Sequence, residues 1–130
     1  MENKNWRAER AVGYLHDGCN CAQAVLRAFQ EELEKNDEDL TAWAAGFGSG
    51  MGSFEGACGA LCGAVMAVGL LNKSNTVSKS IAKEMTAEFK EQSGGAIICG
   101  ELKGIKTGKM LCSCDDCVRH GVMVLEKRLS

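Results

Sequence analysis

The stretch from Ala57 to Leu71, ACGALCGAVMAVGLL, carries no charged side chain, and its only polar groups are the thiols of Cys58 and Cys62. A helix that is apolar on every side belongs in the core of a protein, so this stretch predicts a buried central helix. It is shorter than the roughly 20 residues that a membrane-spanning helix requires. Gly59 and Gly63 lie about one turn apart and would let a second helix pack closely, within the chain or across a homodimer.

The segments around this helix have the apolar spacing of further helices. The sequence contains no proline and no convincing alternation of apolar and polar residues, so strands are not expected. We therefore predict a single compact all-α domain over residues 1–130, with about five to six helices around the central one. Trp6, Trp43 and Phe47 are expected in its core. The apolar faces of the other expected helices span residues 8–15, 22–33, 40–47, 81–89 and 118–129, while 96–112 fits no element.

Length and charge exclude several classes of function. A chain of 130 residues suits one domain that buries a core without disulfide staples. The net charge is −2 and the basic residues are scattered, which excludes the basic surface of a nucleic-acid-binding protein. The first ten residues, MENKNWRAER, are polar and charged, unlike a secretory signal. We expect a cytoplasmic protein without nucleic-acid or membrane partners.

Cysteine is the residue type that points to a function. Eight of the 130 residues are cysteine, and structural disulfides are rare in the reducing cytoplasm. A metal centre or redox chemistry therefore explains so many thiols better than packing alone. The cysteines fall into four clusters along the chain, Cys19/Cys21, Cys58/Cys62, Cys99 and Cys112/Cys114/Cys117.

Three of these cysteines are expected at the start of a helix. Cys21 follows Asn20, a preferred N-cap residue. Cys58 opens the central helix and Cys114 opens the last one, whereas Cys99 is expected in a loop. The unpaired N–H groups and the positive dipole end of a helix favour thiolate over thiol. The same geometry stabilises an anionic cluster held by thiolates, so these helix starts and the loop cysteine can converge on one site.

The spacing of the cysteines matches no single standard metal motif. Cys114-Asp-Asp-Cys117 is the one CxxC pair, whereas zinc ribbons and fingers usually have two. The CxxCxxC run of a two-cluster ferredoxin is absent. The two aspartates also disfavour a second anion beside Cys114. Cys58 and Cys62 are four residues apart, so both can face one centre, or one can be a ligand and the other a core residue or a resolving thiol.

The glycine-rich run from Gly46 to Gly52, GFGSGMG, has neither the register nor the Lys-Ser/Thr pair of a phosphate-binding loop. Its glycines are expected to let the backbone approach a cluster or a partner helix, and to donate N–H groups there. His16 and His120 are the only histidines. Both are expected at the surface or its boundary rather than as ligands, although His16 lies three residues before Cys19 and can join a site.

Five ordered motifs together resemble one protein family. Over nearly its whole length the chain resembles the redox-active proteins labelled C_GCAxxG_C_C, although that label writes Gly-Cys-Ala where this chain has Cys-Gly-Ala. The motifs are NCAQAV at 20–25, GFGxGMG at 46–52, CGAxxG at 58–63, CxELxG at 99–104 and CxxxV at 114–118.

The resemblance implies a small all-α bacterial protein with four signature cysteines. Those four cysteines would hold an iron–sulfur cluster of unspecified type and pass electrons to a redox partner protein. Carried over by motif, they are Cys21, Cys58, Cys99 and Cys114. Outside the pattern lie four secondary candidates for a ligand swap or a second site, Cys19, Cys62, Cys112 and Cys117.

The residues leave two other functions open. A thiol/disulfide oxidoreductase or sulfur carrier would use Cys58 or Cys114 as a low-pKa nucleophile, with a neighbouring thiol to resolve the mixed disulfide. A closed zinc site, the other alternative, would only stabilise the fold. No residue is assigned a catalytic role, because carboxylates fall on polar faces and no Ser-His-Asp pattern is present.

Overall fold

Eight α-helices and two short helical turns follow one another in the part of the chain that the structure, a computed structural model, describes, residues 5–129. The predicted all-α class is confirmed, and within these residues the only strand-like feature is an isolated bridge between Ala57 and Ile98. The elements are α1 (Trp6–His16), α2 (Cys21–Ala28), α3 (Gln30–Leu33), α4 (Asp37–Ala44), η1 (Ala45–Phe47), η2 (Gly50–Phe54), α5 (Gly59–Asn72), α6 (Asn75–Gln92), α7 (Cys99–Lys103) and α8 (Cys114–Glu126).

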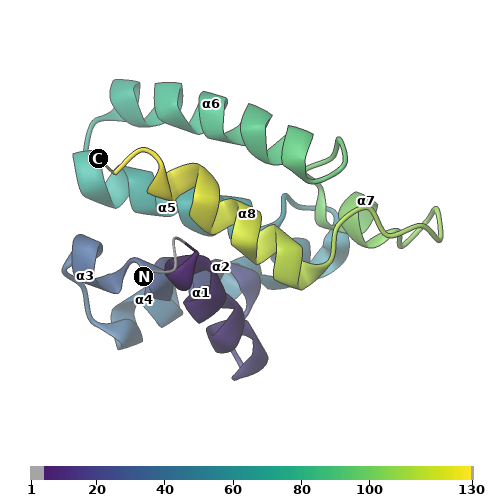
Figure 1. Ribbon diagram of the computed structural model, residues 1–130, viewed down its shortest axis with the longest axis horizontal. Coiled ribbons are helices and arrows are strands. Elements are labelled where there is room, and N and C mark those ends of the chain that lie inside the picture. Colours follow the sequence, from purple (N-terminus) through teal and green to yellow (C-terminus); the bar gives the residue numbers. More distant parts are fainter. Residues whose placement is uncertain (1–4, 130) are drawn as a thin grey trace.

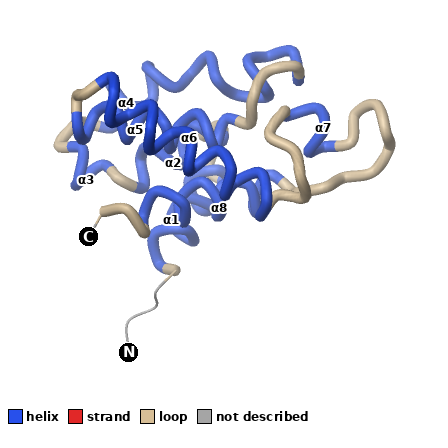
Figure 2. Tube along the Cα trace, turned by 90° about the horizontal axis from the view of Figure 1, so that it is seen from above, coloured by secondary structure: helices blue, strands red, loops and turns tan. Residues whose placement is uncertain are grey.

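The helices form layers around α5 and α8, which lie against each other in the middle of the molecule (Figure 1). The long helix α6 covers one side of this pair, and α1 and α2 cover the other. The short helices α3 and α4 extend the layer of α1 and α2. Figure 2 shows that long loops flank α7 at one end of the molecule. None of the helices between residues 5 and 129 is long and apolar enough to cross a membrane.

The number of helices exceeds the predicted five to six because one expected segment is divided into two helices and a segment without an expected element contains another. The segment 22–33 breaks at Phe29, whose backbone leaves the helical region, so α2 and α3 are separate. The next helix begins earlier than expected, because the Asn36 side chain accepts a hydrogen bond from the Asp39 N–H at 2.7 Å and caps α4. The segment 96–112, which fitted no element, contains α7.

The predicted buried helix, α5, packs against α2, α6 and α8 and buries most of its surface. Part of it remains open, because Cys62, Val65 and Met66 line an apolar groove of about 380 Å³. An apolar sequence predicts burial but does not say how many neighbours a helix will have.

The two tryptophans were also wrongly expected in the core. Trp6 is 40% exposed and Trp43 is 45% exposed, and Phe47 is half-buried. The ring of Trp6 lies beside the guanidinium groups of Arg7 and Arg10, at 4.7 and 5.0 Å from its centroid. Such cations stabilise an aromatic ring at the surface, so the ring of Trp6 does not need to be buried in the core.

Two glycines of α5 bring it close to α2. A Cβ at Gly59 would lie 3.1 Å from the Ala22 nitrogen, and a Cβ at Gly63 would lie 2.7 Å from the Ala22 carbonyl oxygen. The close packing predicted from these glycines therefore occurs within the chain. It fixes the start of α2 against the start of α5, which is where Cys21 and Cys58 lie.

Replacing Gly63 by alanine is expected to destabilise the protein by roughly 1–3 kcal/mol, because the added methyl group overpacks the contact with Ala22. Gly69 on the same helix has open space around it. Gly69→Ala is therefore expected to stabilise by about 0.5–1 kcal/mol through helix propensity alone. Urea unfolding of both variants would measure the difference. Equal effects of the two changes would contradict a close α2–α5 contact.

Candidate functional site

Four cysteines from distant parts of the sequence line one cavity of about 340 Å³. They are Cys21, Cys58, Cys99 and Cys114, the four that correspond to the family motifs. Each lies at the start of a helix: Cys21 begins α2, Cys58 is the N-cap of α5, Cys99 begins α7 and Cys114 begins α8. Cys58 and Cys99 are buried, Cys21 is half-buried and Cys114 is exposed.

Side-chain caps fix two of these helix starts. The Asn20 side chain accepts a hydrogen bond from the Gln23 N–H, and the Gln23 side chain accepts one from the Asn20 N–H, each at 2.8 Å. This capping box confirms Asn20 as the N-cap of α2. Ser113 caps α8 by accepting a hydrogen bond from the Asp116 N–H at 3.1 Å. Both caps directly precede a cavity cysteine, so they hold Cys21 and Cys114 in place.

A short backbone bridge holds the other two cysteines next to each other. The Cys58 N–H donates to the Ile97 carbonyl at 2.7 Å, and the Cys99 N–H donates to the Gly56 carbonyl at 2.9 Å. Cys99 was expected in a loop, and this was wrong, because the segment after the bridge turns into α7. The signal was hidden by the glycine and lysine content of residues 96–112.

The glycine-rich run lies against this site as the sequence suggested. The backbone of Gly50 is left-handed, with φ of +58°, and a Cβ there would lie 2.6 Å from the Cβ of Cys99. A Cβ at Gly48 would lie 2.8 Å from the Asn20 side chain. Only glycine fits both positions without displacing a neighbour, so the run lies directly against Cys99 and Asn20, and Ser49 within it lines the cavity.

The thiols form two hydrogen-bonded pairs with opposite pKa shifts. The hydrogen bond between Cys21 and Cys114 raises the pKa of Cys21 and, together with Lys103, lowers the pKa of Cys114 to about 5. The hydrogen bond between Cys117 and Cys58 raises the pKa of Cys117. The same bond, with the N–H groups at the start of α5, lowers the pKa of Cys58 to about 7. Burial raises the pKa of Cys99.

Lys103 is the part of this site that the sequence analysis missed. It lines the cavity and lies four residues after Cys99 on α7, so the two share a helix face. Its Nζ donates to the Cys112 carbonyl at 3.3 Å and to the Cys117 sulfur at 3.8 Å. Burial opposes the charge on Lys103, but Cys117 and Cys114 outweigh it and raise the pKa. The Cys-x-x-x-Lys spacing was the available signal.

The four secondary cysteines occupy four different environments. Cys117 is fully buried behind Cys58. Cys112 is buried near His120, with 3.8 Å between its sulfur and the ring Nδ1. The sulfur of Cys19 accepts a hydrogen bond from Arg27 at 3.4 Å. Cys62 lines the separate groove along α5. Of these four, Cys117 is the one whose pKa is raised mainly by a cavity cysteine, Cys58, and its sulfur also accepts a hydrogen bond from Lys103.

The two histidines lie away from the cavity wall. The His16 side chain is 62% exposed and pairs with Asp115, at 2.9 Å from Nε2 to the carboxylate. His120 lies at the boundary of the core, where its Nδ1 is 2.9 Å from the hydroxyl of Ser93. Both placements agree with the surface and boundary positions predicted for them. The partner of His16, Asp115, directly follows Cys114 in the sequence. His16 itself does not line the cavity.

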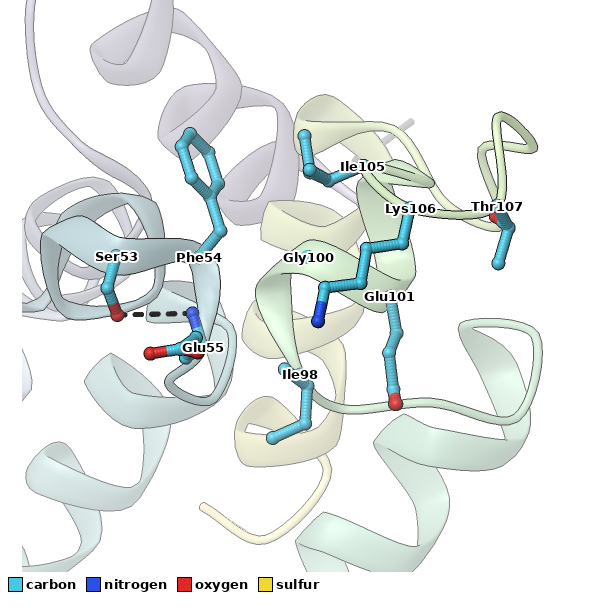
Figure 3. A pocket seen from close by; sticks show the side chains of 9 residues that line it. All are labelled: Ser53, Phe54, Glu55, Ile98, Gly100, Glu101, Ile105, Lys106 and Thr107. Carbon is cyan, nitrogen blue, oxygen red and sulfur yellow. Dashed lines mark hydrogen bonds between the residues drawn. The ribbon is translucent and has the colours of Figure 1, made fainter.

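A second cavity, of about 370 Å³, lies beside the first and shares Phe54 with it. Figure 3 shows it between the η2 turn, which carries Phe54, and the segment with Gly100, Ile105 and Lys106. Gly100 allows this close approach, because a Cβ there would lie 2.7 Å from the Phe54 carbonyl oxygen. Phe54 is 42% exposed, so this residue of the cysteine cavity wall also meets the solvent.

The donor set of the cavity fits an iron–sulfur cluster in its chemistry. Thiolates at helix starts are the ligands that such clusters use, and nearby N–H groups stabilise their negative charge. Within residues 5–129, no three His, Cys, Asp or Glu side chains are grouped so that they would hold a single metal ion.

Comparison with known proteins agrees with the motifs. A family model described as "Putative redox-active protein (C_GCAxxG_C_C)" matches residues 19–128. The match covers all eight cysteines and every helix from α2 onward. No curated protein and no solved structure matched the chain. Because the family model spans most of its length, the chain belongs to the C_GCAxxG_C_C family of redox-active proteins.

Proposed function

We propose that the cavity holds an iron–sulfur cluster through Cys21, Cys58, Cys99 and Cys114, and that the protein passes electrons to a partner protein. One observation carries this proposal: four thiols from four separate helix starts line the same cavity. Packing alone gives no reason for four helices to begin with cysteine around one space. A thiolate-ligated group within the cavity would use all four.

In this proposal the chain's own residues perform three tasks. The helix starts and Lys103 offset the negative charge of the thiolates. Gly50 lets the glycine-rich run lie against the buried Cys99, and Ser49 and Phe54 line the cavity beside it. When bound, the cluster supplies one-electron redox chemistry. Cys114, which is exposed, lies where a redox partner protein can approach.

A thiol/disulfide couple is the second candidate function, and one observation favours it. Cys21 and Cys114 form a hydrogen-bonded pair in which one pKa is raised and the other is lowered to about 5. Such a pair supplies a thiolate nucleophile and a resolving thiol. We rank it second because it leaves Cys99 without a role. All eight cysteines are free thiols, so either function has its thiols available.

Anaerobic purification distinguishes these functions. Protein expressed with iron and sulfide available is expected to be brown, with broad visible absorbance and inorganic sulfide that equals the iron in amount. A colourless protein with stoichiometric zinc would support the structural zinc site instead. A colourless protein with neither metal, and with two thiols that oxidise and reduce reversibly, would support the thiol couple. Either result would overturn the cluster.

A further inference from the structure

Lys103 is a half-buried cation whose close partners are all sulfur atoms or a carbonyl. Its Nζ lies 3.8 Å from the Cys117 sulfur and 3.3 Å from the Cys112 carbonyl oxygen. Cys114 also acts on this ammonium and helps to raise the pKa of Lys103. Both Lys103 and Cys114 line the cysteine cavity.

No carboxylate in the described residues forms an ion pair with Lys103. The buried Arg7, by contrast, pairs with both Glu32 and Glu126. A charge that is taken out of water without a partner is costly. Among residues 5–129, the thiols beside Lys103 are therefore the groups that can supply compensating negative charge to its ammonium.

We propose that Lys103 is the built-in countercharge of the redox centre and raises its reduction potential. This inference rests on the proposed function. A cluster held by four thiolates is anionic, and reduction adds one electron from the donor without making or breaking a covalent bond. Lys103 keeps its proton in both states. A fixed positive charge beside the cavity therefore stabilises the reduced state more than the oxidised one.

The position of Lys103 makes this effect different from that of a surface lysine. Exposed charges are largely screened by salt, whereas partly buried pairs are screened much less. Lys106, three residues later, is exposed and lines the neighbouring cavity. It is a matched control, because its replacement removes the same charge from the same part of the chain without touching a thiol.

The test compares wild type, Lys103→Met, Lys103→Arg and Lys106→Met after anaerobic purification. Iron and sulfide content, far-UV circular dichroism and the midpoint potential are measured for each, at 0.15 M and 1 M salt. Lys103→Met is expected to lower the equilibrium constant for reduction at least tenfold, which is about 59 mV for one electron. This difference should persist at high salt. Lys103→Arg and Lys106→Met should stay close to wild type.

Each outcome separates the two proposals. An iron-loaded Lys103→Met with an unchanged potential overturns the countercharge and leaves the cluster in place. An iron-free wild type overturns the cluster and the countercharge with it. If folded Lys103→Met loses iron while Lys103→Arg keeps it, a positive charge is needed to hold an anionic group, which supports the inference. Iron loss from both variants, with Lys106→Met loaded, would mean that shape rather than charge matters.

Discussion

Replacing Cys58 by serine is expected to remove most of the bound iron while leaving the protein folded. Cys58 is 2% exposed, so water cannot readily take the place of a lost ligand. It is also the N-cap of α5, a position that serine prefers. The substitution therefore keeps the helix start and removes the sulfur. Iron analysis after anaerobic purification, together with circular dichroism, would separate loss of the ligand from loss of the fold.

Two other cysteines provide controls for this experiment. Cys62 lies one turn further along α5 and lines a different groove, so Cys62→Ser should keep its iron. Cys117 contacts Cys58 but does not line the cavity, so Cys117→Ser should lose less iron than Cys58→Ser. Equal loss from the changes at Cys58 and Cys117 would mean that the ligand set includes Cys117. The centre would then lie closer to the fully buried Cys117 of α8 than to the exposed Cys114.

The metal-free protein is expected to form a disulfide between Cys21 and Cys114 in air or with oxidised glutathione. The Cys114 thiolate attacks the disulfide of glutathione and releases one glutathione thiolate. Cys21 then attacks the mixed disulfide and releases the second, so two thiol protons and two electrons leave the protein. Both thiols line the same cavity, and the pKa of each is shifted by the other. A second disulfide between Cys58 and Cys117 is expected because these two thiols also shift each other's pKa.

The pH dependence identifies which thiol begins the reaction. The pKa of Cys114 is lowered to about 5, so its thiolate fraction is nearly full at pH 7 and the rate should fall only as the pH approaches 5. Burial raises the pKa of Cys62, so its reaction should need alkaline pH. Non-reducing alkylation and peptide mapping by mass spectrometry would assign each pair. If all the cavity thiols stay alkylatable after oxidation, the paired arrangement is wrong.

Much of the fold follows from local signals in the sequence. The spacing of apolar residues, the absence of proline and the N-cap at Asn20 predicted an all-α domain, and the structure confirms this. The prediction missed α7 because its five residues contain a single apolar turn between glycine-rich segments. It placed Trp6 and Trp43 in the core, but both are exposed. The sequence near an aromatic residue does not show whether its ring will pack in the core or, as for Trp6, against a cation at the surface.

The candidate site was predictable in part. The residue types and the family motifs singled out Cys21, Cys58, Cys99 and Cys114, and helix-start reasoning placed three of them at N-termini. That these four meet in one cavity depends on contacts far apart in the sequence. Among them are the packing of α2 on α5 through Gly63 and the bridge that joins Ala57 to Ile98.

The sequence by itself thus determined the main helices, the cap at Asn20 and the supply of thiols, because each depends on neighbours within a few residues. The tertiary structure alone decided which thiols form pairs and where Lys103 lies. The pairs join residues 93 and 59 positions apart, Cys21 with Cys114 and Cys58 with Cys117. Periodicity and capping carry no information over that distance, since the partner of a side chain is set by how whole helices pack.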